Sequence, residues 1–203
     1  MELLVLNGNP DPANHIWEQY LADWSAALRD RDVRTEVVHL REMDIRYCNG
    51  CWSCWWATPG RCSRQDDLPS LYPRILRADV LVWASPLVMG NVSALTKKAQ
   101  DRFIPLLHPF IEMVGGESHH RRRYDKDINM ALIAAPGAGD DAEDLDIVRQ
   151  QHERLALNGR GRLLFFLSTT TAPSVGADQA VKACLNPGQP STQKEEHRES
   201  ISA

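Results

Sequence analysis

Residues 2–10, which read Glu2-Leu3-Leu4-Val5-Leu6-Asn7-Gly8-Asn9-Pro10, decide the fold class that the sequence predicts. Four apolar residues in succession, bounded by turn-forming residues, are typical of a short strand that is buried on both faces. A helix is predicted at residues 14–29, because apolar side chains recur there at helical spacing. The chain therefore opens with a strand, a loop and a helix, which favours a parallel sheet.

The same alternation continues along the chain. Because the later strands are also apolar throughout, we expect helices on both faces of the sheet. Residues 109–128 are rich in Gly, His and Arg and are predicted to be irregular. The predicted fold class is α/β, a flavodoxin-like three-layer sandwich with a five-stranded parallel sheet in the order 2-1-3-4-5. Its remaining strands are predicted at residues 35–40, 79–84, 129–135 and 162–167, and its helices at 67–77, 93–108, 144–157 and 178–185.

Composition predicts one globular domain at residues 1–185 and a polar C-terminal tail at 186–203. Of the 203 residues, 43% are hydrophobic and 25% are charged. The net charge of -4 argues against a nucleic-acid partner. The apolar runs are far shorter than the roughly 20 residues that cross a bilayer, and no secretion signal is recognisable. We therefore expect a cytoplasmic protein without a membrane partner.

Three predicted loops follow the carboxyl ends of predicted strands, at residues 7–14, 85–91 and 136–139. In an open parallel sheet, ligands bind beyond these ends, where the strand order reverses. Each loop contains Gly or Pro, which suits a close approach of backbone to a ligand. A ligand site at this edge is therefore predicted.

Four of the five cysteines fall within a cysteine-rich loop at residues 48–62. An odd total and such clustering do not suit a disulfide framework. In a reducing compartment they indicate metal or redox chemistry. The four are Cys48, Cys51, Cys54 and Cys62.

Several motifs occur together between residues 1 and 167. They are Asn7-Gly8-Asn9-Pro10-Asp11-Pro12, Cys48-x-x-Cys51-x-x-Cys54 with Thr58-Pro59-Gly60-Arg61-Cys62, Asp66-Asp67, Ala84-Ser85-Pro86, and Gly90-Asn91-Val92-Ser93 followed by Lys97 and Asp101-Arg102. In combination they resemble the flavodoxin-like NAD(P)H-dependent FMN reductase and quinone reductase superfamily, whose cysteine-motif branch includes the iron-sulfur flavoproteins. The resemblance implies bound FMN, NAD(P)H as electron donor, a quinone-like small acceptor, and a homodimer or homotetramer.

The FMN site is predicted at the three loops. The first loop would hold the phosphate near the amino end of the following helix, with Asn9, Asn14 and His15 as side-chain donors. Asp11 should cap that helix or face solvent. The second and third loops would offer apolar surface and backbone polar groups to the flavin ring. No catalytic acid or base is assigned, because the flavin carries the hydride. The predicted cofactor-binding residues are Asn9, Asn14, His15, Ser85, Pro86, Leu87, Val88, Gly90, Asn91, Pro136 and Gly137.

Two interpretations of the cysteine motif stay open. The spacing of Cys48, Cys51, Cys54 and Cys62 is similar to that of a 4Fe-4S site, whereas a zinc site usually separates two Cys pairs more widely. The other interpretation is a loop without metal, whose thiols are reduced or transiently paired. The corresponding alternative functions are an iron-sulfur electron carrier and a thiol redox sensor.

Two further segments have open interpretations. Trp52, Trp55 and Trp56 can cover the flavin, contact a second subunit, or form a small core under the loop. The basic run at residues 119–123 can attract the phosphates of NAD(P)H or form a solvated loop. The acidic run at residues 140–144 is interpreted as the start of a helix.

Overall fold

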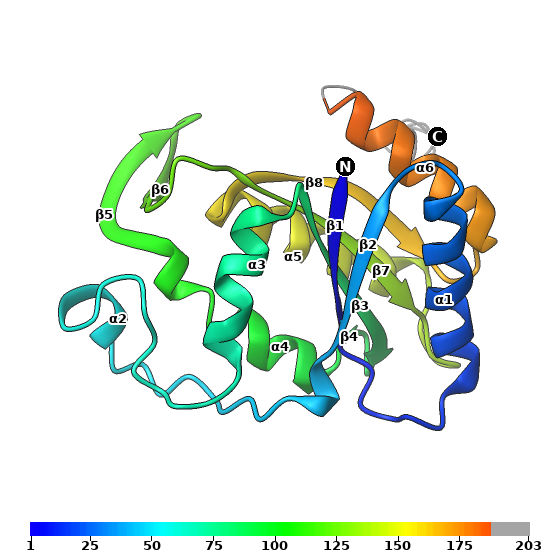
Figure 1. Ribbon diagram of the computed structural model, residues 1–203, viewed down its shortest axis with the longest axis horizontal. Coiled ribbons are helices and arrows are strands. Elements are labelled where there is room, and N and C mark those ends of the chain that lie inside the picture. The colour runs from blue at the N-terminus through cyan, green and yellow to red at the C-terminus, as the bar shows by residue number, and fades with distance from the viewer. Residues whose placement is uncertain (188–203) are drawn as a thin grey trace.

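Figure 1 shows the computed structural model, which describes residues 1–187. Strands and helices alternate, as predicted, but the short helix in the cysteine-rich loop and the two strands between residues 107 and 122 were not predicted. The strands are β1 (Glu2–Asn7), β2 (Arg34–His39), β3 (Val80–Val88), β4 (Asn91–Val92), β5 (Leu107–Val114), β6 (Glu117–Arg122), β7 (Ile128–Ala135) and β8 (Arg160–Ser168). The helices are α1 (His15–Arg29), α2 (Ser53–Trp56), α3 (Leu71–Arg77), α4 (Ala94–Gln100), α5 (Ala142–Asn158) and α6 (Pro173–Leu185), with 3-10 turns at Leu40–Glu42, Leu68–Ser70 and Ile104–Leu106.

The central sheet has the strand order β2-β1-β3-β7-β8, and these five strands are all parallel. Counted among the parallel strands alone, this is the predicted order 2-1-3-4-5. The short β4 adds an antiparallel pairing to the end of β3, between Leu87 and Val92. The fold is therefore the predicted flavodoxin-like α/β sandwich with one additional short strand, β4.

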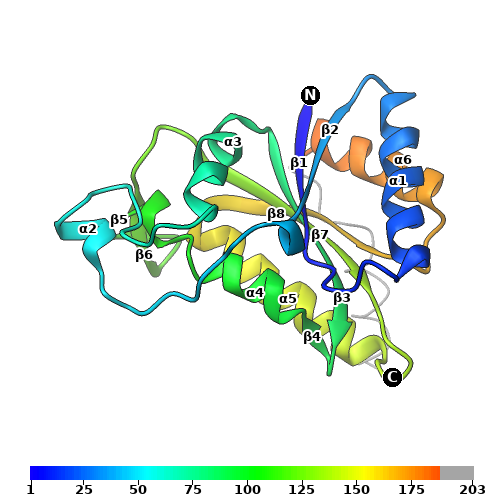
Figure 2. The same ribbon diagram turned by 60° about the horizontal axis from the view of Figure 1, so that its bottom comes forward.

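Helices cover both faces of the sheet. In Figures 1 and 2, α1 and α6 lie together on one side, and α3, α4 and α5 lie on the other. Successive residues of β1 serve opposite faces: Leu3 packs with Trp17 and Trp24 of α1, whereas Leu4 packs in the other cluster. Two buried faces explain why the strands are apolar without alternation.

The predicted helix at residues 93–108 is too long. Helix α4 begins after Ser93, whose hydroxyl accepts from the backbone N–H of Thr96, and it ends at Gln100. The following turn contains Pro105, which cannot donate a backbone hydrogen bond to a continuing helix. Residues 104–106 therefore form a 3-10 turn that leads into β5.

The predicted irregular stretch at residues 109–128 is also wrong in part, because β5 and β6 form an antiparallel hairpin. Its turn is Gly115-Gly116, with φ of 58° and 86°. Two glycines at positive φ are the requirement of a tight hairpin turn. In Figures 1 and 2 this hairpin lies beside α2, at the end of the molecule away from α1 and α6.

Other boundaries differ from the predictions by several residues. Strand β3 runs to Val88, so Ser85 to Val88 extend the strand instead of forming a loop. Helix α6 begins at Pro173, earlier than the predicted 178, because proline at the first helical position suits a helix start. Residues 188–203 of the predicted tail lie outside the described residues. Within the described part of the chain, every helix is too short or too polar to cross a lipid bilayer.

Candidate functional site

The loop after β1 is held by buried amide side chains. Asn7 and Asn9 are 0% and 1% exposed, and both donate to the carboxylate of Glu18, at 3.0 and 2.7 Å. Trp17 donates its indole N–H to the Asn7 side chain at 2.9 Å. Arg41 pairs with the same Glu18 at 2.6 Å. The loop is therefore fixed from α1 and from the segment after β2.

This first loop also packs tightly against the start of α4. The carbonyl of Gly8 accepts from the Ser93 hydroxyl at 2.6 Å, and the Gly8 N–H donates to Ala84 of β3 at 2.8 Å. A Cβ atom at Gly8 would lie 1.8 Å from Oγ1 of Thr96. Only glycine fits here, because the loop backbone meets the helix directly.

The second predicted segment forms the β3–β4 turn. Ser85 is fully buried, and its hydroxyl accepts from the backbone N–H of Ser93 at 2.9 Å. Val88 and Met89 are 53% and 98% exposed, and Met89 has a positive φ of 52°. A large apolar side chain in such a backbone conformation is uncommon. The turn therefore presents apolar surface to solvent at the carboxyl edge.

Asp140 joins the second and third segments. Its carboxylate accepts from the backbone N–H of Gly90 at 3.2 Å and from that of Gly137 at 2.7 Å. The acidic run was interpreted only as a helix start, which is correct for Asp141 and Asp144, the two members of the capping box of α5. The bridging role of Asp140 depends on Gly90, which is 50 residues away in the chain, so local spacing did not predict it.

Most of the predicted polar donors of the first loop are already engaged. Asn9 donates within the loop, and the Asn14 side chain accepts from the backbone N–H of Trp17 as the N-cap of α1. Asp11 is exposed and accepts from the backbone N–H of Ala13. Among the predicted donors, His15 is exposed, and its imidazole has no partner in the described residues. A phosphate at this loop would thus meet His15 and the amino end of α1.

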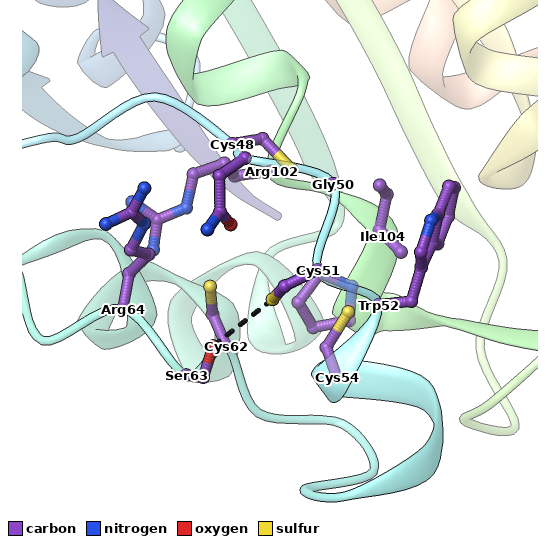
Figure 3. Close-up of a pocket in the computed structure, with 12 residues that line it drawn as sticks. Cys48, Gly50, Cys51, Trp52, Cys54, Cys62, Ser63, Arg64, Arg102 and Ile104 are labelled. Atoms are coloured by element: carbon purple, nitrogen blue, oxygen red, sulfur yellow. Dashed lines mark hydrogen bonds between the residues drawn. The ribbon is translucent and has the colours of Figure 1, made fainter.

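The four clustered cysteines line one pocket, together with Arg102 and residues of the adjoining loops. Figure 3 shows Cys48, Cys51, Cys54 and Cys62 around this pocket. They come from both sides of α2, since Cys54 lies within the helix and Cys62 returns after the turn at Gly60, which has φ of 79°. The other lining residues are Asn49, Gly50, Trp52, Ser63, Arg64, Ile104 and Pro105.

The thiols of this pocket differ in acidity. Hydrogen bonds from Ser53 and Ser63 lower the pKa of exposed Cys51 to about 7, and its sulfur lies 3.4 Å from the Ser63 hydroxyl. Burial raises the pKa of Cys54, and the nearby charges of Cys62, Cys51 and Cys48 raise it further. The four sulfurs therefore influence one another electrostatically. All five cysteines of the chain are free thiols.

The indole of Trp55 lies between the pocket and the hairpin. Its ring packs at a tilt against Trp52, at 4.7 Å between ring centroids, and against His120 of β6, at 4.9 Å. Its N–H donates to the carbonyl of Ile104. Trp56 is 74% exposed.

The basic run lies on β6, and its charges are largely paired. Arg121 contacts Glu112, Arg122 contacts Asp127, and Arg123 donates to the carbonyls of Pro105 and Leu107.

A family model described as NADPH-dependent FMN reductase matches residues 1–137. The chain belongs to this family. The matched segment includes the first two loops, the cysteine pocket and Pro136-Gly137 at the start of the third loop. This membership agrees with the family resemblance that the sequence motifs carry.

Relatives with similar sequences are named iron-sulfur flavoproteins. One from Archaeoglobus fulgidus is 30% identical over 102 residues, which are 50% of this chain and 48% of that protein. Another from Methanocaldococcus jannaschii is 27% identical over 106 residues, 52% of this chain and 53% of that protein. The chain spans about half the length of these relatives.

Solved structures share the fold at low sequence identity. An NAD(P)H:quinone oxidoreductase from Methanothermobacter marburgensis has a TM-score of 0.61 and 17% identity, over 92% of this chain and 98% of that one. An apo NADH:FMN oxidoreductase has a TM-score of 0.57 and 14% identity, over 94% of this chain and 92% of that one. At these identities the likeness concerns the fold.

The residues of the loop edge and of the pocket fit different groups. Exposed Val88 and Met89 suit a flat apolar ring, and the adjacent first loop offers the amino end of α1. Among residues 1–187, no three His, Cys, Asp or Glu side chains lie close enough together for a single metal ion. An iron-sulfur cluster places irons and sulfides between its thiolates, so four cysteines around one pocket suit it without such close approach.

Proposed function

We propose that this protein transfers electrons from NAD(P)H, through bound FMN, to a quinone or a similar small acceptor. The observation that carries this proposal is the joining of the three loops into one surface. Ser93 connects the first loop to the second, and Asp140 connects the second to the third. A flavin needs such a continuous surface, because its phosphate and its ring contact different loops.

Each part of this surface has a separate task in the proposal. The amino end of α1 and the His15 side chain would hold the phosphate. Val88 and Met89 would cover one face of the ring and exclude water from it. The backbone around Gly137 would meet the polar edge of the ring. When bound, FMN supplies the hydride-accepting chemistry, and the chain orients it.

Steady-state NAD(P)H oxidation by the FMN-loaded protein tests this proposal. We expect rapid, saturable turnover that depends on both the nicotinamide and a soluble quinone. Omission of the quinone, with oxygen excluded, is the control. A colourless protein that does not take up FMN would contradict the proposal.

The phosphate site is tested separately by His15→Ala. We expect this variant to bind FMN several-fold more weakly, because one charge-assisted contact to the phosphate is lost. Riboflavin, which lacks the phosphate, should bind wild type and variant equally. Both affinities are measured by quenching of flavin fluorescence, and an equal loss for the two ligands would argue against the assigned site.

A second candidate function is one-electron transfer through a 4Fe-4S cluster held by Cys48, Cys51, Cys54 and Cys62. The single pocket that these thiols line favours it, and the names of the relatives agree.

Anaerobic reconstitution with iron and sulfide tests the cluster. We expect about four irons and four sulfides per chain for a 4Fe-4S site. Cys48→Ser and Cys54→Ser should lose most of this iron, whereas Cys184→Ser is the matched control. Cys184 lies on α6, and burial raises the pKa of its thiol to about 11. Equal iron content in all variants would contradict the assignment.

If no iron is bound, the exposed Cys51 thiol favours the redox-sensor alternative, because a pKa of about 7 leaves much of it as thiolate at neutral pH. We place this chemistry in a reducing cytoplasm, which would keep such thiols from pairing.

We also propose a homodimer or homotetramer. The exposed apolar residues Phe110, Ile111 and Met113 of β5 support self-association, which light scattering after size-exclusion chromatography would test.

A further inference from the structure

The guanidinium of Arg102 is buried at the wall of the cysteine pocket. Its side chain is 1% exposed, directly after the end of α4, and it lines the pocket together with the four thiols. Arginine side chains are almost never fully buried unless they are paired. A charge in this position therefore needs a physical reason.

Asp66 supplies part of that reason. Its side chain is 0% exposed, and both of its oxygens accept from the two terminal nitrogens of Arg102. Arg102 also donates to the carbonyl of Arg46 at 3.0 Å, and the Arg46 N–H donates to Asp66 at 3.0 Å. This bidentate geometry fixes the plane of the guanidinium. A buried ion pair contributes little net stability compared with apolar residues, so stability alone does not explain it.

One donor of Arg102 is left over. Its Nε–H is buried and has no hydrogen-bond partner in the described residues, and Nε of Arg64, which also lines the pocket, is in the same situation. Burial alone lowers the pKa of Arg102, but the Asp66 hydrogen bond and the adjacent Cys62 raise it overall. Asp66 is not among the residues that line the pocket, so the positive partner of the pair is the one that faces the sulfurs.

An iron-sulfur core with four thiolate ligands carries a net negative charge, which grows by one when it accepts an electron. A fixed positive charge nearby stabilises the reduced form more than the oxidised form, and the effect is strong where water is excluded. Hydrogen bonds and charges near the sulfurs are among the factors that set a cluster potential.

We propose that Arg102 is a positioning residue that raises the reduction potential of a cluster held by Cys48, Cys51, Cys54 and Cys62, and that Asp66 fixes its orientation. This inference rests on the second candidate function. It assigns a task to two buried residues that the flavin surface does not use.

The test compares Arg102→Gln with Arg102→Lys after anaerobic reconstitution. The readouts are iron per chain, the midpoint potential of the cluster from an EPR-monitored redox titration, and the melting temperature of the iron-free protein. We expect Arg102→Gln to disfavour reduction at least tenfold, which is a shift of about 59 mV to more negative potential for one electron. Arg102→Lys should recover part of this shift, because it restores the charge without the fork.

Two further variants separate this role from folding. Arg102→Gln leaves Asp66 as an unpaired buried charge. The double variant Arg102→Gln/Asp66→Asn removes that charge as well. The double variant should keep the negative shift, because the charge that faces the pocket is still missing. Arg149→Gln is the matched control, since Arg149 is 17% exposed and pairs with Asp146 and Glu153 along α5. Its potential should equal that of wild type.

Each outcome decides the inference. A full complement of iron with an unchanged potential in Arg102→Gln and in the double variant would overturn the role of Arg102 and leave the cluster in place. Wild-type protein that takes up no iron and sulfide would overturn both. If Arg102→Gln loses its iron, the potential is measured in the double variant, where a shift to more negative potential would support the role and the wild-type value would overturn it.

Discussion

At the scale of single residues, buried polar side chains position the functional surfaces. Asn7 and Ser93 each connect segments that are distant in sequence, and Asp140 does so with one carboxylate. Such groups are costly to bury unless they are hydrogen-bonded. Each bond therefore also selects one arrangement of the loops.

Asp140→Asn should loosen the loop surface. The amide retains one oxygen and places an N–H₂ group against a backbone N–H that formerly donated to carboxylate. We expect FMN affinity to fall roughly tenfold, from a loss of about 1–2 kcal/mol. Flavin fluorescence titration measures this. Asp125→Asn, at a fully exposed side chain, is the control, and equal affinities for the two variants would contradict the bridging role.

His152 should make stability depend on pH. It is 2% exposed, its Nδ1–H donates to the Val148 carbonyl, and its Nε2 accepts from Gln100, so the folded protein holds the neutral ring. Burial lowers its pKa from the model-peptide value of 6.5, although the Val148 bond opposes this. Below about pH 6.5 the unfolded chain binds a proton that the folded chain does not, so stability falls as pH falls.

Urea unfolding between pH 7 and pH 5 measures this effect. The contribution of His152 to the slope is at most about 1.4 kcal/mol per pH unit. His152→Gln should be less stable at pH 7 and should lose part of the slope, because glutamine does not titrate. A variant with the wild-type slope would show that other groups cause the pH dependence.

At the scale of elements, the loop after β1 and the amino end of α4 form one packed unit. The Ser93 hydroxyl caps α4 and also donates to Gly8, so one side chain serves both elements. The β5–β6 hairpin is a separate unit beside α2, and Trp55 packs against its His120. The first unit positions the loop surface and the second borders the cysteine pocket.

Gly8→Ala should damage the first unit. The added methyl would lie 1.8 Å from the Thr96 hydroxyl oxygen, which is buried, so we expect a loss of about 1–3 kcal/mol in unfolding free energy. Thr96→Ala removes that oxygen. The double variant should therefore lose less unfolding free energy than the two single variants lose together. Denaturant unfolding of all four proteins measures this coupling, and simple additivity would contradict the contact.

At the scale of the whole molecule, two apolar clusters on opposite faces of the sheet hold the three layers together. The loop surface lies at the carboxyl edge of this sheet. The cysteine pocket includes Cys54 of α2, and Figure 1 shows α2 and the hairpin at the end of the molecule away from α1 and α6. A ligand bound at the edge contacts segments from widely separated parts of the chain. Binding should therefore stabilise the fold as a unit.

FMN at one hundred times its dissociation constant should raise the unfolding free energy by about 2.7 kcal/mol. For a chain of this length the melting temperature should rise by roughly 5–10 °C. Riboflavin at the same concentration should produce a smaller rise, because it lacks the phosphate. Differential scanning fluorimetry with intrinsic Trp emission measures both, and equal shifts for the two flavins would contradict a phosphate site.

The sequence by itself determined the parallel sheet, its strand order and the family, because apolar strands buried on both faces and compact motifs are local signals. It also indicated which cysteines belong together. The hairpin escaped prediction because its strands carry charged and apolar residues without a clean period, although Gly115-Gly116 was a usable turn signal.

Only the tertiary structure decided which polar groups remain available for a ligand. Asn9 and Asn14 were predicted to be donors, yet the fold uses both within the first loop and the start of α1. Arg102 gained its role from Asp66, 36 residues away in the chain, and Asp140 reaches Gly90, 50 residues away, as well as the nearby Gly137. Hydrogen bonding of a buried group depends on distance in space, which local spacing does not encode, so these assignments had to come from the folded chain.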